Sequence, residues 1–120
     1  MGRPVPIYGD GMQSRDFTFV ANVVEANVLA ATAEGVNGRI LNIATGSPIS
    51  VNELTDTIGR VLGRDVEKTY LPPRPGEVRD SSADLSEARK LLGYETRVGL
   101  EEGLRRTADF LLAEQLADAP

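Results

Sequence analysis

The sequence contains no cysteine, no histidine and no tryptophan among its 120 residues. Without cysteine it has no disulfide framework, no thiolate nucleophile and no thiolate metal site. Without histidine, the common zinc clusters and catalysis by serine–histidine or cysteine–histidine pairs are excluded as well. Any catalysis by this chain would therefore depend on carboxylate, hydroxyl or amine side chains.

Basic residues are outnumbered, with 13 Lys and Arg against 18 Asp and Glu and a formal net charge of −5. A protein whose main ligand is nucleic acid or anionic lipid needs a basic face, so this balance argues against both partners. It still allows a small anion site built from a few arginines. No apolar run approaches the roughly 18 residues of a membrane span, and no leader pattern begins the sequence. We therefore predict a cytoplasmic protein without a membrane partner.

The length and the 41% hydrophobic content suit one small domain over residues 1–120. Hydrophobic spacing predicts an α/β or α+β fold, a small mixed domain of short strands and about four helices. Ser50 and Glu53 form a capping box that opens a helix, and Gly63 ends it. The expected helices cover residues 21–34, 51–62, 84–92 and 100–116, and the expected extended segments cover 4–8, 16–20, 39–44 and 66–71.

Two loops carry arginines in rigid surroundings. Arg15 follows a turn made by Gly9 and Gly11, and Arg74 lies within the proline-rich loop 72–76. Two planar guanidinium groups on separate rigid loops suit a diphosphate. The residues alone leave other interpretations open, because Arg15 can pair with Asp16 and Arg74 can be a solvated loop charge. Glu77 can equally be a surface carboxylate, and Tyr8 and Gln13 ordinary residues beside a turn.

Glycine patterns for cofactor binding are incomplete. The turn at residues 9–11 lacks the final glycine of a dinucleotide fingerprint, and Gly35-x-x-Gly38 precedes an expected strand instead of a helix. No Gly-Lys-Ser or Gly-Lys-Thr is present, which excludes the phosphate loop of nucleoside triphosphatases. We therefore expect this chain to bind no cofactor by itself.

Longer motifs nevertheless resemble a known family. The sequence is similar to the C-terminal, substrate-binding part of the NAD-dependent nucleotide-sugar epimerases and dehydratases, which are extended short-chain dehydrogenases, and it is close to the UDP-glucose 4-epimerase type. The resemblance covers nearly the whole chain. The motifs that carry it are Pro6-Ile7-Tyr8-Gly9-Asp10-Gly11-x-Gln13-x-Arg15-Asp16-Phe17-x-x-Val20, Asn42-x-x-x-Gly46, Arg74-x-Gly76-Glu77-Val78-x-x-x-Ser82-Ala83-Asp84, Leu91-Leu92-Gly93-Tyr94 and Leu100-Glu101-Glu102-Gly103-Leu104.

The resemblance implies a role for each matching residue. Arg15 and Arg74 match arginines that hold the diphosphate of a UDP- or dTDP-sugar, and Glu77 matches an acidic residue that binds the ribose hydroxyls. Pro6 and Tyr8 match positions beside the base. Gln13 is expected to line the same pocket, whereas Asp16, Asn42 and Asp84 are expected to be structural. Asn22, where many members carry Asp, resembles epimerases that act on N-acetylated sugars.

The catalytic part of the family has no counterpart in this sequence. In the family, NAD is bound by an N-terminal Rossmann domain that also supplies a Tyr-x-x-x-Lys motif. Here Tyr8, Tyr70 and Tyr94 are followed four residues later by Met12, Arg74 and Val98, and none of these is lysine. The resemblance therefore implies an incomplete enzyme with no catalytic residue of its own, which needs the Rossmann domain or a companion chain.

The segment 21–34 is unusually apolar for a surface helix, with only five polar residues. In the family, the corresponding segment and the strand after it pack against the nucleotide-binding domain. Without that domain, we expect an apolar patch and hence self-association, local disorder or refolding around residues 21–44.

Three hypotheses follow. The first is the UDP-sugar-binding portion of a sugar 4-epimerase, with an NDP-sugar dehydratase as its close alternative. The second is a noncatalytic nucleotide-binding module used for sensing. The third is a small α/β domain whose apolar helix serves as a protein-interaction surface.

Overall fold

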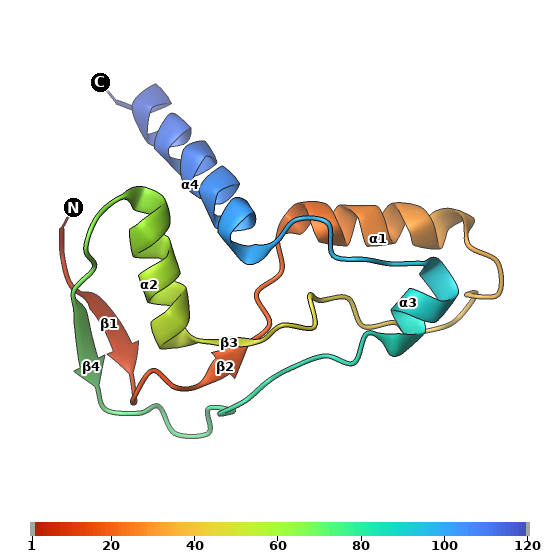
Figure 1. Ribbon diagram of the computed structural model, residues 1–120, viewed down its shortest axis with the longest axis horizontal. Coiled ribbons are helices and arrows are strands. Elements are labelled where there is room, and N and C mark those ends of the chain that lie inside the picture. The colour runs from red at the N-terminus through yellow and green to blue at the C-terminus, as the bar shows by residue number, and fades with distance from the viewer. Residues whose placement is uncertain (1, 120) are drawn as a thin grey trace.

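The computed structural model describes residues 2–119, which form four short strands and four helices (Figure 1). This arrangement confirms the mixed α/β class and the expected helices to within a few residues. The elements are β1 (Val5–Tyr8), β2 (Ser14–Arg15), α1 (Val20–Thr32), β3 (Ile49–Ser50), α2 (Val51–Leu62), β4 (Lys68–Leu71), α3 (Ser86–Leu92) and α4 (Leu100–Ala117).

The strands form two separate two-stranded sheets. β1 and β4 are parallel, with Val5 opposite Lys68 and Tyr8 opposite Leu71. β2 and β3 are antiparallel, with Ser14 opposite Ser50. Because β1 and β4 run in the same direction, the loops that follow them leave from the same edge of the sheet.

Helix α2 begins and ends at the residues that the sequence predicts. The Ser50 hydroxyl accepts a hydrogen bond from the Glu53 N–H at 3.1 Å, and the Glu53 carboxylate accepts one from the Ser50 N–H at 2.8 Å. Gly63 ends the helix in the left-handed conformation, with φ 65°. The first turn of α2 also donates the N–H of Val51 to the Gln13 carbonyl, which fixes the loop between β1 and β2.

The main hydrophobic core lies around α1 and α3. It consists of small and medium side chains together with Tyr94, whose hydroxyl donates to the Ala44 carbonyl at 2.7 Å. Asn22 on α1 is also buried, and its side chain is bonded to the backbone of residues 97 and 98. The buried core residues are Ala26, Ala44, Leu85, Ala88, Leu92 and Tyr94.

Two predicted strands are wrong. β2 ends at Arg15, residues 16–19 form no ladder, and Val20 already begins α1. Within residues 2–119, β2 pairs with Ile49 and Ser50 and forms one isolated bridge from Ser14 to Asp80, and the chain enters α2 directly after Ser50. Residues 39–44 are irregular as well, since no described strand pairs with them. Their β-rich composition thus has no neighbouring strand with which to pair.

The molecule is flat and open. Its Cα radius of gyration is 17.2 Å, whereas a compact domain of this length has about 14 Å. Its accessible surface is 8458 Å², and a compact protein of the same mass exposes about 6,300 Å². The excess of about 2,000 Å² is larger than one side of a standard protein interface.

Part of the excess surface is apolar. Val20, Val24 and Val28 follow one another at i, i+4 spacing on α1, and all three are more than half exposed. We call these three residues the valine stripe. The C-terminal half of α4 projects away from the other elements in Figure 1 and exposes Phe110 and Leu116. No helix within residues 2–119 is long and apolar enough to cross a membrane.

Candidate nucleotide site

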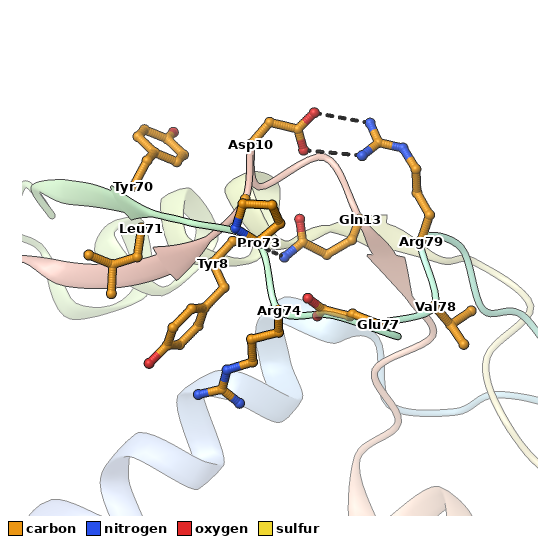
Figure 2. Close-up of a pocket in the computed structure, with 11 residues that line it drawn as sticks. Tyr8, Asp10, Gln13, Tyr70, Leu71, Pro73, Arg74, Glu77, Val78 and Arg79 are labelled. Atoms are coloured by element: carbon orange, nitrogen blue, oxygen red, sulfur yellow. Dashed lines mark hydrogen bonds and ion pairs between the residues drawn. The ribbon is translucent and has the colours of Figure 1, made fainter.

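A pocket lies where the loops after β1 and β4 meet (Figure 2). Its volume is about 770 Å³, which falls within the range of small-molecule sites. Residues 8–13 and 70–79 contribute its walls, although the two segments are far apart in the sequence. The lining residues are Tyr8, Gly9, Asp10, Gln13, Tyr70, Leu71, Pro73, Arg74, Glu77, Val78 and Arg79.

Arg74 is the free cation of this pocket. Its guanidinium carbon lies 3.8 Å from the centre of the Tyr8 ring, which is a cation–π contact. Within residues 2–119, Arg74 takes part in no ion pair. The loop that carries it continues from β4, where Gly9 N–H donates to the Leu71 carbonyl at 2.8 Å. Prolines stiffen this loop, so little backbone entropy is lost when Arg74 binds an anion.

Gln13 is buried at the base of the pocket. Its amide nitrogen donates to the Tyr8 carbonyl at 2.9 Å and so connects the two ends of the β1–β2 loop. Gly11 in the same loop adopts φ 74°, and a Cβ there would lie 2.2 Å from the Asn52 side-chain oxygen. The positive φ favours glycine at this position, and any other residue would also displace the Asn52 side chain, which is hydrogen-bonded to the Asp10 carbonyl and the Tyr70 hydroxyl.

Arg15 is not one of the lining residues, but it contacts Glu77, which is. Its guanidinium donates to three backbone carbonyls, those of Ser14 at 2.6 Å, Val78 at 2.5 Å and Arg79 at 3.1 Å. One of its nitrogens is 3.8 Å from the Glu77 carboxylate. A guanidinium has five N–H donors, so two remain for a ligand. Pairing with Asp16 does not occur, because that carboxylate binds the backbone of residues 45 and 46.

The structure adds Asp10 and Arg79 to the predicted site residues. Arg79 donates to both oxygens of the Asp10 carboxylate, at 3.3 and 3.1 Å. This hydrogen-bonded pair holds the pKa of Asp10 below its usual value and raises the pKa of Arg79. Arg79 follows the proline-rich loop 72–76 by three residues, and the pairing joins positions 69 residues apart. No local sequence signal points to it.

The predicted site residues are thus brought together only in part. Tyr8, Gln13, Arg74 and Glu77 line one pocket, and Arg15 reaches it through Glu77. Pro6 lies outside the lining, on β1 opposite Thr69, with an exposed side chain.

The charges at this site favour an anion. Three arginines, at positions 15, 74 and 79, lie in or beside the pocket, against the carboxylates of Asp10 and Glu77. The site is therefore locally cationic in a protein whose net charge is −5. Planar guanidinium groups bind phosphate oxygens in pairs, so a phosphate-bearing ligand suits this arrangement.

Comparison with solved structures gives the class of protein, the sugar-nucleotide epimerases and dehydratases among the extended short-chain dehydrogenases. The fold corresponds to a C-terminal portion of these enzymes. Residues 1–107 match the family described as GDP-mannose 4,6 dehydratase, and the chain belongs to this family. The family resemblance stated from the sequence motifs is thereby confirmed.

Individual relatives are similar over nearly all of this chain. A UDP-glucose 4-epimerase of Mycolicibacterium smegmatis is 39% identical over 109 residues, which are 91% of this chain and 34% of that protein. The structure of a Thermotoga maritima UDP-glucose 4-epimerase with UDP-glucose has a TM-score of 0.87 at 39% identity and covers 95% of this chain and 36% of that one.

A Bacillus cereus UDP-glucuronic acid 4-epimerase, in complex with UDP-glucuronic acid and NAD, has a TM-score of 0.86 at 31% identity. The match covers 96% of this chain and 36% of the epimerase. The present chain therefore spans about a third of the length of the relatives that it matches.

Proposed function

We propose that this chain is the portion of an NAD-dependent sugar 4-epimerase that binds the nucleoside diphosphate of a UDP-sugar. The observation that carries the proposal is the pocket at the β1–β4 edge, which joins an arginine that forms no ion pair within residues 2–119, an aromatic ring and a carboxylate. Relatives named for UDP-sugars support the same ligand class.

Each pocket residue has a chemical task in this proposal. Arg74 supplies a free guanidinium for the diphosphate, and Arg15 supplies the two N–H donors that its backbone contacts leave available. Glu77 accepts hydrogen bonds from ribose hydroxyls. The base lies against Tyr8, with Pro6 at the outer margin and Gln13 at the base of the pocket. The contribution of these residues to the reaction is positioning of the sugar nucleotide.

NAD does not fit the described residues. The turn at residues 9–11 leads into strand β2 instead of the N-terminus of a helix, so it forms no cradle for a pyrophosphate. The sequence also has no Tyr-x-x-x-Lys motif. We therefore assign NAD and the chemistry at the sugar to a companion portion, and the chain alone to binding without turnover.

The open shape supports a companion. The surface excess of about 2,000 Å² is of the size that stable interfaces bury, and the valine stripe on α1 makes part of this surface apolar. In our proposal, the nucleotide-binding companion covers this face. When the companion is absent, the same face is expected to drive self-association through residues 21–44.

Two other functions remain as candidates. The matching family is described as GDP-mannose 4,6 dehydratase, so the bound sugar nucleotide can be the substrate of an elimination of water instead of an epimerisation. A noncatalytic nucleotide-binding or protein-interaction module would use the same pocket or the same valine stripe without a reaction. Assembly with a nucleotide-binding companion followed by assay of both reactions distinguishes the enzymes from the modules.

The experiment that tests the proposal is an amide NMR titration of the chain with UDP, with UMP and inorganic phosphate as controls. We expect shifts centred on Tyr8, Arg15, Arg74 and Glu77, and tighter binding of UDP than of UMP, because the second phosphate adds charge-assisted hydrogen bonds. A well-dispersed spectrum that no nucleotide changes would overturn the assignment of a preformed site in this chain.

A further inference from the structure

Two segments that are distant in the sequence, residues 10–15 and 77–81, are joined along one wall of the pocket. Ser14 N–H donates to the Arg79 carbonyl at 2.9 Å, and Ser81 N–H donates to the Ser14 carbonyl at 3.1 Å. The Ser14 hydroxyl also donates to Asp80 at 2.7 Å. We call this set of contacts the wall junction. Because Glu77 and Arg15 lie on its two segments, the junction determines where both side chains are held.

One ion pair closes the wall junction at its outer end. The two nitrogens of Arg79 bond to the two oxygens of Asp10 (Figure 2). The Asp10 carboxylate is itself fixed, since one of its oxygens accepts the Met12 N–H at 2.9 Å. Because two parallel hydrogen bonds join the side chains, the pair fixes their relative orientation more closely than a single surface contact does.

The same residue also holds the candidate phosphate-binding arginine. The Arg79 carbonyl accepts hydrogen bonds from Ser14 N–H and from the Arg15 guanidinium, the latter at 3.1 Å. The Arg79 side chain donates to Asp10. A movement of residue 79 therefore displaces one contact of the Arg15 guanidinium and one contact of its neighbour Ser14.

We infer that the Asp10–Arg79 ion pair is a positioning pair for the nucleoside diphosphate site, which acts by fixing the wall junction and, through it, the orientation of Arg15. The inference rests on the proposed function, because it requires that Arg15 bind the diphosphate. Arg79 directs two of its five N–H donors at Asp10, and the inference assigns it a positioning role instead of a direct phosphate contact.

The substitution Asp10→Asn separates positioning from direct contact by the sign of its effect. If Arg79 positions the site, loss of the carboxylate charge loosens the junction and lowers UDP affinity by about three- to tenfold. If Arg79 instead binds phosphate itself, the same substitution frees its guanidinium and raises UDP affinity, which would overturn the inference. Asp109→Asn, an exposed aspartate on α4, is the matched control and is expected to change nothing.

A double-mutant cycle tests whether Arg79 acts through Arg15. Arg79→Gln is expected to lower UDP affinity by about three- to tenfold in the native chain and to have no further effect in an Arg15→Ala background, because coupled residues are not additive. Equal losses in both backgrounds would show that Arg79 acts independently of Arg15 and would contradict the inference. Thermal unfolding of each variant verifies that it is folded.

A measurement without nucleotide distinguishes a failure of this inference from a failure of the proposed function. Hydrogen exchange of the Ser14 and Ser81 amides reports directly on the wall junction. We expect Asp10→Asn and Arg79→Gln to accelerate both amides by about threefold or more, and Asp109→Asn to leave them unchanged. Unchanged exchange in the first two variants refutes the junction, whereas faster exchange in a chain that binds no UDP refutes only the proposed function.

Discussion

Within the pocket, the environments of the arginine side chains determine their roles. Arg15 donates hydrogen bonds to three backbone carbonyls, and Arg79 forms an ion pair with Asp10. Within residues 2–119, Arg74 forms no ion pair, and its guanidinium lies over the Tyr8 ring. A phosphate that enters the pocket therefore gains most from Arg74, whose charge has no carboxylate partner to be displaced.

Arg74→Ala is accordingly expected to weaken UDP binding by about 1.5–3 kcal/mol, as for the loss of charge-assisted hydrogen bonds. Arg15→Ala is expected to cost a similar amount. Isothermal titration calorimetry with UDP measures both values. Arg64→Ala is the control, since that exposed arginine is not among the lining residues and its loss should leave the affinity unchanged. Native affinity in both site variants would mean that the diphosphate does not bind between these arginines.

Asn22 shows how a single buried residue takes a structural role. Its amide nitrogen donates to the Val98 carbonyl at 2.8 Å, and its oxygen accepts from the N–H groups of Arg97 and Val98 at 3.1 and 3.0 Å. The side chain is 1% exposed. All of these contacts join α1 to the segment before α4, so they explain the choice of asparagine without reference to an N-acetylated sugar.

Asn22→Asp is expected to destabilise the chain by at least about 2 kcal/mol at neutral pH, because the carboxylate oxygen that replaces the amide nitrogen would be buried against the Val98 carbonyl, while the other oxygen keeps its two backbone N–H donors. Chemical denaturation measures the loss. Asn27→Asp introduces the same charge on an exposed position of the same helix and should cost far less. Equal losses of stability in the two variants would show that any added negative charge on α1 has this effect, and that the buried contacts of Asn22 do not cause it.

At the scale of elements, the helices could be predicted and several strands could not, for a physical reason. A helix carries its own start and stop signals, such as Ser50 and Glu53 at the start of α2 and Gly63 at its end. A strand exists only where another strand pairs with it. Residues 16–20 and 39–44 have suitable composition, yet the described chain offers them no partner.

The candidate site shows the same division between local and distant information. The family motifs suffice to predict that Tyr8, Arg74 and Glu77 belong to one site. They do not predict the Asp10–Arg79 pair, because its two members are 69 residues apart and meet only when β1 and β4 are aligned in parallel.

The capping box of α2 is expected to stabilise both the helix and the pocket. Ser50→Ala removes the acceptor for the Glu53 N–H and should lower the free energy of unfolding by about 1 kcal/mol. Since Val51 and Asn52 of the same turn donate to the carbonyls of Gln13 and Gly11, the amide signals of this loop should also shift in an NMR spectrum. Ser47→Ala, an exposed serine before the helix, is the control. A native stability in Ser50→Ala would show that tertiary contacts alone hold this helix end.

At the scale of the whole molecule, openness is the dominant property. The radius of gyration of 17.2 Å and the surface of 8458 Å² describe a chain whose elements do not enclose one another on all sides. The buried core consists largely of alanine and leucine, so apolar area on α1 and α4 stays in contact with solvent. Exposure of this apolar area to water is unfavourable in free energy, and burial against another protein surface removes the exposure.

The isolated chain is therefore expected to self-associate in a concentration-dependent manner. Replacing Val24 and Val28 together by Glu places two charges in the valine stripe, and sedimentation should then report a monomer at concentrations where the native chain is a dimer or larger. Leu116→Glu is the matched control on the exposed part of α4, and self-association that persists in this variant assigns the contact to α1. A native chain that sediments as a monomer at all concentrations, with strong amide protection across residues 21–44, would instead show that this open shape is stable by itself.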